Sequence, residues 1–186
     1  MVALGRPRLL VAVLALYLPF FVVYFASSIG FSLPRAAAAC GGQPVLDQRW
    51  GYSASRVAEY LRGCGVTGRA AISAQQDADL AYPALFGAAL TVSLALLLRV
   101  VLRDRHWAHL LVLLPAITTA ADYLENIGIR VLLAAYPEQP RIVPALSVVT
   151  TVKLATGGAS IAVLVILAAT AGVRRLRTTA AAGRFR

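Results

Sequence analysis

The chain has 186 residues, of which 59% are hydrophobic and only 14% are charged, and its mean hydropathy is +0.73. Soluble domains carry about 25% charged residues, so this composition excludes an ordinary soluble protein and indicates an integral membrane protein. The net charge of +10 does not indicate nucleic-acid binding, because the arginines lie beside apolar stretches rather than in one basic patch.

Four apolar stretches are long enough to cross a hydrocarbon core, which needs about 20 residues of helix. They cover residues 9–29, 80–102, 108–135 and 144–172. We therefore expect an all-α, polytopic membrane protein in which residues 1–186 form a single four-transmembrane-helix bundle. The first stretch also has features of a cleaved signal peptide, but it is long for one, and we favour a retained helix.

The arginines predict the orientation of the bundle. They form three clusters before the first span, between the second and third, and after the fourth: Arg6 and Arg8; Arg99, Arg103 and Arg105; and Arg174, Arg175, Arg177, Arg184 and Arg186. All three positions face the same side of a four-span protein. The positive-inside rule then predicts a multi-pass cell-membrane protein with both termini in the cytoplasm.

The extracytoplasmic segment 30–78 predicts a short amphipathic helix. Ser53 is a candidate N-cap for this helix, and Gly65 is a candidate end. The helix would lie on the membrane surface or cap the bundle. Cys40 and Cys64 are the only cysteines, and both fall in this segment. They would form a disulfide in an oxidising compartment, although two unpaired cysteines are the alternative.

The second span opens with "DLAYPALFG", which places Asp79, Tyr82 and Phe86 on one face. Pro83 should loosen the helix at this point. The only histidines, His106 and His109, lie in the next turn and offer too few ligands for a metal. No nucleotide motif is present either, so the sequence predicts neither a metal nor another cofactor.

The third span carries polar residues on one face. At about 100 degrees per residue, six residues share it: Thr118, Thr119, Asp122, Glu125, Asn126 and, at its edge, Arg130. The opposite face consists of leucine, valine and alanine. Asp122 lies about 20 Å of helix rise from either end of the span, which places it near the middle of a bilayer.

The fourth span has a similar polar face, which includes Thr150 and Lys153. Lys153 is the only lysine, since every other basic residue except the two histidines is an arginine. Lys153 and Glu125 lie about 14 and 15 Å from the outer ends of their spans, so antiparallel neighbours would meet at one depth.

These charged residues predict a buried polar pocket. An ionisable residue inside a membrane costs at least about 2.5–3.5 kcal/mol unless it faces the bundle interior and finds a partner. We take Asp122, Glu125 and Lys153 as candidate catalytic groups, with Arg130 turned outward toward Asp79 or the interface. The candidate ligand-binding residues are Asp79, Tyr82, Phe86, Thr119, Asn126, Arg130 and Thr150. The alternative is a charged clamp that only fixes the register of the helices.

Four short motifs resemble those of an uncharacterised family of small bacterial four-span membrane proteins. They are "YSASRVAEYLRGCG", "DLAYPALFG", "DYLEN" and "TTVK", between Tyr52 and about Ala169. The resemblance implies the four-helix fold and marks the same polar residues, without implying a reaction. A remoter analogy, with no matching motif, is to the sterol-isomerase and sigma-2-receptor group.

Three functional hypotheses follow. The first is a pocket for a membrane lipid or another apolar small molecule, in which proton transfer such as double-bond isomerisation would need no cofactor. The second is a small proton-coupled transporter, for which a homodimer would supply a second half. The third is a non-catalytic scaffold or subunit. We favour the first hypothesis, and the sequence does not decide whether the ligand is transformed.

Overall fold

The computed structural model describes residues 7–103, 105–138 and 141–183. The protein is 83% helical and has no strand in these ranges. Four helices are long and apolar enough to cross a membrane. They are α1 (Pro7–Ala26), α4 (Tyr82–Val101), α5 (Leu113–Ala135), which the short 3-10 helix η2 (His106–Val112) precedes, and α6 (Val143–Gly183). The predicted spans differ from these helices by a few residues, except that α6 continues beyond residue 172.

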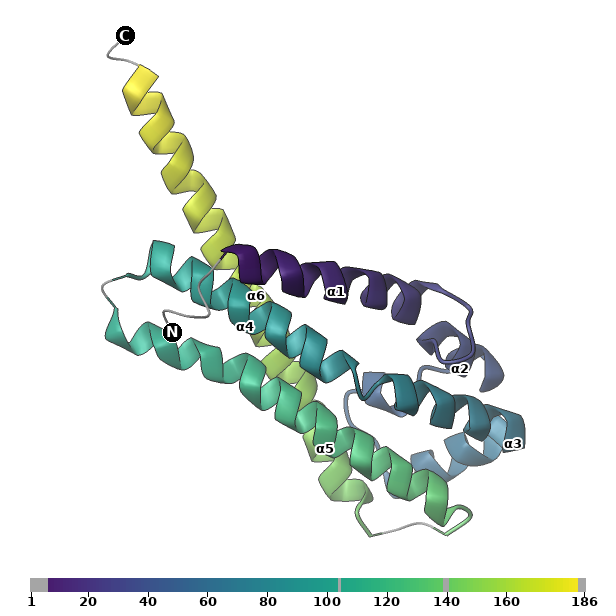
Figure 1. The fold of residues 1–186 in the computed structure, drawn as a ribbon. Helices are drawn as coiled ribbons and strands as arrows, with labels where there is room; N and C mark the ends of the chain where they lie inside the picture. The colour runs from purple at the N-terminus through teal and green to yellow at the C-terminus, as the bar shows by residue number, and fades with distance from the viewer. Residues whose placement is uncertain (1–6, 104, 139–140, 184–186) are drawn as a thin grey trace.

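The two ends of the bundle differ in charge and in structure. The start of α1, the α4–α5 connection and the far part of α6 lie at one end (Figure 1). We call it the arginine end after Arg8, Arg99, Arg103, Arg105 and Arg174. Arg6, Arg184 and Arg186 of the predicted clusters lie outside the described residues. The opposite end, which we call the loop end, holds α2 (Leu33–Ala39), η1 (Leu46–Gln48) and α3 (Ala54–Ala78).

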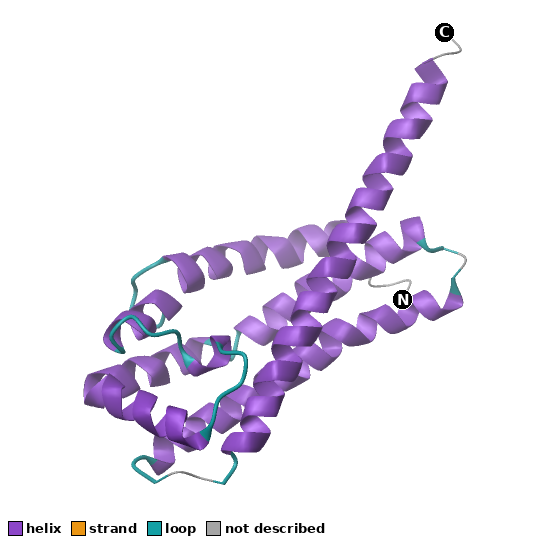
Figure 2. Ribbon diagram, turned by 180° about the vertical axis from the view of Figure 1, so that it is seen from behind, coloured by secondary structure: helices purple, strands orange, loops and turns teal. Residues whose placement is uncertain are grey.

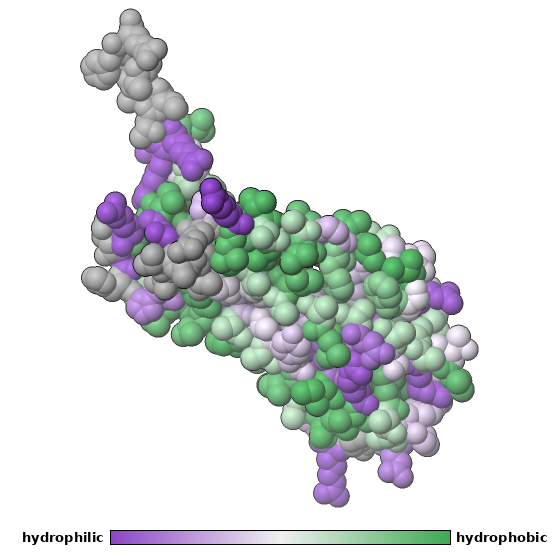
Figure 3. Space-filling view, viewed as in Figure 1, coloured by the Kyte–Doolittle hydropathy of each residue, from purple (hydrophilic) through white to green (hydrophobic). Residues whose placement is uncertain are grey.

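Helices α4, α5 and α6 form the packed centre of the bundle. Each packs against the other two, and α6 runs diagonally across the pair (Figure 2). Small residues allow the close approach, since a Cβ at Gly128 of α5 would stand 2.4 Å from Cδ1 of Leu146. By contrast, α1 packs on α4 and α2, and it makes no comparable contact with α6. Its surface forms part of an apolar band beside the hydrophilic arginine end (Figure 3).

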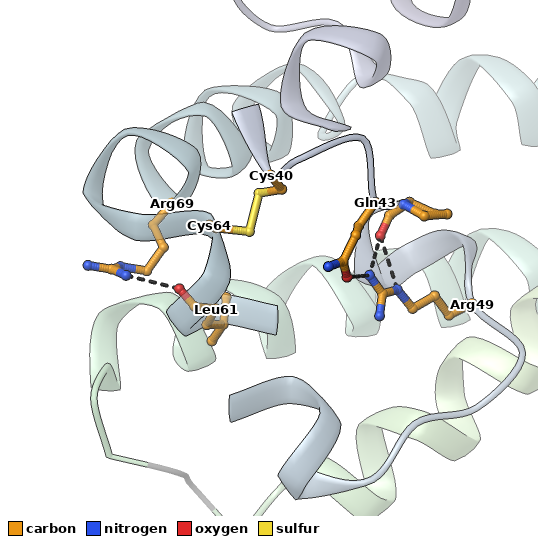
Figure 4. Close-up of a disulfide and its surroundings, with 7 residues drawn as sticks. Cys40, Gln43, Arg49, Leu61, Cys64 and Arg69 are labelled. Carbon is orange, nitrogen blue, oxygen red and sulfur yellow. Dashed lines mark hydrogen bonds between the residues drawn. A yellow bond between two sulfur atoms is a disulfide. The ribbon is translucent and has the colours of Figure 1, made fainter. Parts of the chain in front are cut away.

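The loop end is folded into a cap rather than into one short helix. Ser53 caps α3 by accepting a 3.4 Å hydrogen bond from the Arg56 amide. At Gly65 the chain takes a φ of 62°, where α3 kinks, because this left-handed conformation suits glycine. A disulfide between Cys40 and Cys64 joins α2 to α3 (Figure 4). Buried apolar residues, among them Leu46 of η1 and Ile72 of α3, pack against the ends of α5 and α6.

We expect Gly68→Ala in α3 to destabilise this cap by about 1–3 kcal/mol, because the site is fully packed. An added Cβ would lie 2.7 Å from the Cys64 Cβ and 2.8 Å from the Ala39 carbonyl oxygen. Gly63→Ala is the matched control on the same helix, since it meets no atom within 4 Å. It should be neutral or stabilising by up to about 1 kcal/mol. Thermal unfolding in detergent measures both, and equal midpoints would contradict the close packing of α2 on α3.

Candidate functional site

A cavity of about 340 Å³ lies toward the loop end, where residues from six helices and from the turn after α3 surround it. Its wall contains both polar and apolar residues. The polar residues are Tyr24, Asp47, Gln48, Asp79, Tyr82, Thr118, Asp122 and Lys153; the others are Phe25, Leu33, Phe86, Leu154, Gly157, Gly158 and Ile161. The cavity is therefore suited to a molecule with a polar end and an apolar body.

Lys153 of α6 is the centre of a buried charge cluster. Its Nζ donates a hydrogen bond to the Glu125 carboxylate and lies 3.4 Å from Oδ1 of Asp122. Thr150 donates to the other carboxylate oxygen of Glu125, and its hydroxyl also lies 2.9 Å from that of Tyr52. The side chain of Glu125 is completely buried, whereas Asp122 and Lys153 reach the cavity wall. The structure thus brings together these three residues, which the sequence predicted to converge.

Asp79 is a second acid in the cavity wall. It is the C-cap residue of α3, and Asn126 of α5 fixes the turn by donating a 3.1 Å hydrogen bond to its carbonyl oxygen. Tyr24 of α1 donates a 2.7 Å hydrogen bond to Oδ1. Burial, together with the negative charges of Asp47 and Asp122, raises the pKa of Asp79 to about 8. The carboxyl group is therefore mostly protonated at neutral pH.

Asp47 is a third acid in the wall, and sequence reasoning missed it. It lies in η1, next to Val45 and Leu46, which are each 2% exposed and hold this short turn against the bundle. Its side chain is buried, and this burial raises the pKa of the Asp47 carboxyl group. The positive charge of Lys153 acts in the opposite direction and lowers that pKa. The sequence signal that could have predicted its burial was the apolar pair that precedes it, because an acid beside two buried residues has little access to water.

The other predicted site residues lie in the cavity wall, behind it or away from it. Tyr82 and Phe86 line the cavity, where their rings stack 5.3 Å apart. Asn126 and Thr150 lie behind the wall and position Asp79 and Glu125. Thr119 does not reach the cavity; its hydroxyl bonds to the Pro115 carbonyl oxygen and lies against α4 at Gly87.

Arg130 was expected to turn outward toward Asp79 or the interface, and the structure turns it outward but not toward Asp79. Its guanidinium pairs with Asp77 at 2.7 Å rather than with Asp79, and it also donates to the Gln76 carbonyl oxygen. Asp79 ends α3 and turns into the protein, whereas Asp77 lies two residues earlier and faces outward. Arg130 is thus part of an exposed ion pair beside α3, outside the cavity wall.

A second cavity, of about 520 Å³, lies at the arginine end and shares no wall residue with the first. Its wall includes Arg99, Arg103 and Arg105. An apolar cluster around Leu94, Leu98 and Leu167 packs this half of the bundle. Within the described ranges no group of three or more histidine, cysteine or acidic residues is placed to hold a metal ion.

Comparison with known proteins finds no family model, curated protein or solved structure that matches this chain. The chemistry of the cavity is therefore inferred from its own residues. Three buried carboxyl groups and one ammonium group can orient the polar end of a bound molecule and can exchange a proton with it.

Proposed function

We propose that this protein crosses the cell membrane four times, with both termini in the cytoplasm, and binds a lipid or another apolar small molecule in the loop-end cavity. The observation that carries the proposal is a cavity of about 340 Å³ that joins an apolar wall to a set of buried carboxyl groups. Ligand sites of roughly 300–1,000 Å³ with mostly apolar walls and a few convergent polar groups are typical of small-molecule binding.

The ligand enters the cavity between α1 and α6. These two helices make little contact with each other, and Gly158 and Ile161 of α6 are exposed although they belong to the cavity wall. In a bilayer this side faces the hydrocarbon core, so an apolar molecule enters directly from the lipid. A hydrophilic substrate would have no advantage on such a route, which supports an apolar ligand.

Binding accounts for these features better than proton-coupled transport. A transporter needs polar groups along a path across the membrane. Here the charged cluster lies beside the loop-end cavity, while the apolar cluster around Leu94, Leu98 and Leu167 packs the arginine half. A proton-transfer reaction on the ligand remains a separate proposal, and it would use Asp122 rather than Glu125, because Glu125 does not line the cavity.

We expect Gly158→Leu to abolish ligand retention, because it adds a large side chain at the cavity wall. An added Cβ at Gly158 meets no protein atom within 4 Å, so the substitution should leave the fold intact. Gly172→Leu is the matched control, since Gly172 also lies on α6, has no atom within 4 Å and does not line the cavity.

Native mass spectrometry with lipid extraction, on protein purified in mild detergent, tests this prediction by measuring the bound ligand. A defined small molecule should remain bound to the wild type and to Gly172→Leu and be lost from Gly158→Leu. Thermal unfolding of all three proteins establishes that they are folded. If the folded wild type and both variants retain the same lipids in the same amounts, the cavity is not the binding site and the proposal fails.

A further inference from the structure

The carboxyl groups around the cavity outnumber the basic groups. Asp47, Asp79 and Asp122 line the wall, and Glu125 lies directly behind it. Among the described residues, Lys153 is the only basic one in the wall, and it is already shared between Asp122 and Glu125. In the described part of the chain, neither Asp47 nor Asp79 has an ion-pair partner within 4 Å. The site therefore has an excess of acid that its own residues do not neutralise.

Asp47 and Asp79 also lie close together, at the two ends of one hydrogen-bonded chain. Tyr24 donates to Oδ1 of Asp79, Gln75 donates to the Tyr24 hydroxyl, and the same Gln75 nitrogen lies 3.4 Å from Oδ2 of Asp47. The remaining oxygen of each carboxyl group, Oδ1 of Asp47 and Oδ2 of Asp79, is buried and has no hydrogen-bond partner. Buried oxygens of this kind are normally paired. Oδ1 of Asp47 and, once Asp79 has lost its proton, Oδ2 of Asp79 are therefore acceptors that lack a donor.

Resting on the function proposed above, we propose that the ligand is an amphiphile whose polar end is an ammonium group, bound through its N–H donors by Asp47 and Asp79. Its apolar chain lies against Phe25, Leu33 and Ile161. An alcohol would donate only one hydrogen atom and would add no positive charge. A quaternary ammonium would bring the charge without an N–H donor, and a fatty acid would be repelled by the carboxylates.

The titratable groups that face this position come from five helices and from the turn after α3. They are Tyr24 of α1, Asp47 of η1, Asp79 after α3, Tyr82 of α4, Asp122 of α5 and Lys153 of α6. Burial raises the pKa of Asp79 to about 8, so below that pH an incoming ammonium must displace its proton into solvent. Affinity should therefore rise about tenfold for each pH unit between pH 6 and pH 8, and level off above pH 8. An alkyl ammonium itself stays charged up to about pH 10.

Isothermal titration calorimetry of the full-length protein in mild detergent tests the proposal with three probes. These are dodecylamine, dodecanol and dodecyltrimethylammonium. Titration of Gly158→Leu gives the heat of their partition into micelles, which is subtracted from the heat measured with the wild type. At pH 8 we expect dodecylamine to bind at least about tenfold more tightly than either of the others. Dodecylamine should show the rise in affinity between pH 6 and pH 8, and dodecanol should not. Because the amine displaces a proton, its observed binding enthalpy should differ between buffers of different ionisation enthalpy.

Variants of the two acids identify the position of the head group. Asp79→Asn and Asp47→Asn should each reduce the preference for dodecylamine over dodecanol by at least about tenfold. Asp77→Asn is the matched control, since Asp77 is an exposed acid two residues from Asp79 that pairs with Arg130 outside the cavity. It should bind the amine as the wild type does. Using two acid variants keeps the test decisive if one of them fails to fold.

The outcomes separate this inference from the function on which it rests. If dodecanol binds as tightly as dodecylamine at pH 8, or if both acid variants keep the full amine preference, the ammonium assignment is overturned and the apolar cavity stands. If no probe binds the wild type more tightly than it binds Gly158→Leu, the binding function itself is overturned. Tight amine binding that requires both acids and increases up to pH 8 supports the inference.

Discussion

Lys153→Met is expected to reduce the free energy of unfolding by about 3–5 kcal/mol. The side chain of Lys153 is 12% exposed, and those of Asp122 and Glu125 are 4% and 0% exposed. Methionine keeps most of the length of the side chain but removes the ammonium group, so two buried carboxyl groups lose the cation that pairs with them. Titration with a denaturing detergent, followed by circular dichroism, measures the loss.

The double variant Lys153→Met with Glu125→Gln tests whether this loss comes from the unpaired charge. Removing both partners of a buried pair costs less than removing one, so the double variant should recover part of the stability. Arg130→Met breaks an ion pair in which the two side chains are 37% and 68% exposed, and should cost less than about 1 kcal/mol. Equal losses in Lys153→Met and Arg130→Met would show that burial of the cluster contributes little.

The same double variant separates a binding site from a charged clamp. If the charges only fix the register of α5 and α6, a folded double variant should retain the ligand as the wild type does. If the cluster also acts on the polar end of the ligand, the folded double variant should retain a different amount of it. An ammonium ligand should be retained more strongly, because the repelling charge of Lys153 is gone. Ligand content by native mass spectrometry, normalised to folded protein, gives the comparison.

The parts of the fold that the sequence predicted depend on local patterns. Span positions follow from the length of the apolar stretches, and the meeting of Lys153 with Glu125 follows from helix rise and the antiparallel arrangement of neighbouring spans. Burying a charge without a partner inside a membrane is very unfavourable. Asp122, Glu125 and Lys153 therefore had few possible ion-pair partners other than one another. Local periodicity together with this electrostatic penalty was therefore sufficient for the centre of the site.

The parts that were missed depend on contacts between distant segments. Asp47 looks like an ordinary loop acid among arginines, and only the folding of η1 against the bundle takes it into the cavity wall. The hydrogen bond from Tyr24 to Asp79 joins residues 55 positions apart. Arg130 could reach either Asp77 or Asp79 by sequence position, and the end of α3 decides between them. No helical periodicity extends across such connections.

Tyr24→Ala is expected to cost about 3–5 kcal/mol and to loosen α1 from the bundle. Tyr24 is the only buried residue that α1 contributes, with 1% of its surface exposed. Its ring stacks between Phe20 and Tyr82, with centroid distances of 5.5 and 5.7 Å. Val22→Ala on the same helix is the control, because Val22 is 58% exposed and should change stability by less than about 0.5 kcal/mol.

Tyr24→Phe separates the ring from the hydroxyl group. The phenyl ring keeps the stacking, but Oδ1 of Asp79 loses its donor, so we expect a smaller loss of about 1–3 kcal/mol. Because the ring also forms part of the cavity wall, Tyr24→Phe should still retain the ligand, whereas Tyr24→Ala should not. Equal stability of Tyr24→Ala and Val22→Ala would mean that α1 is held by its apolar surface in the bilayer rather than by this one buried side chain.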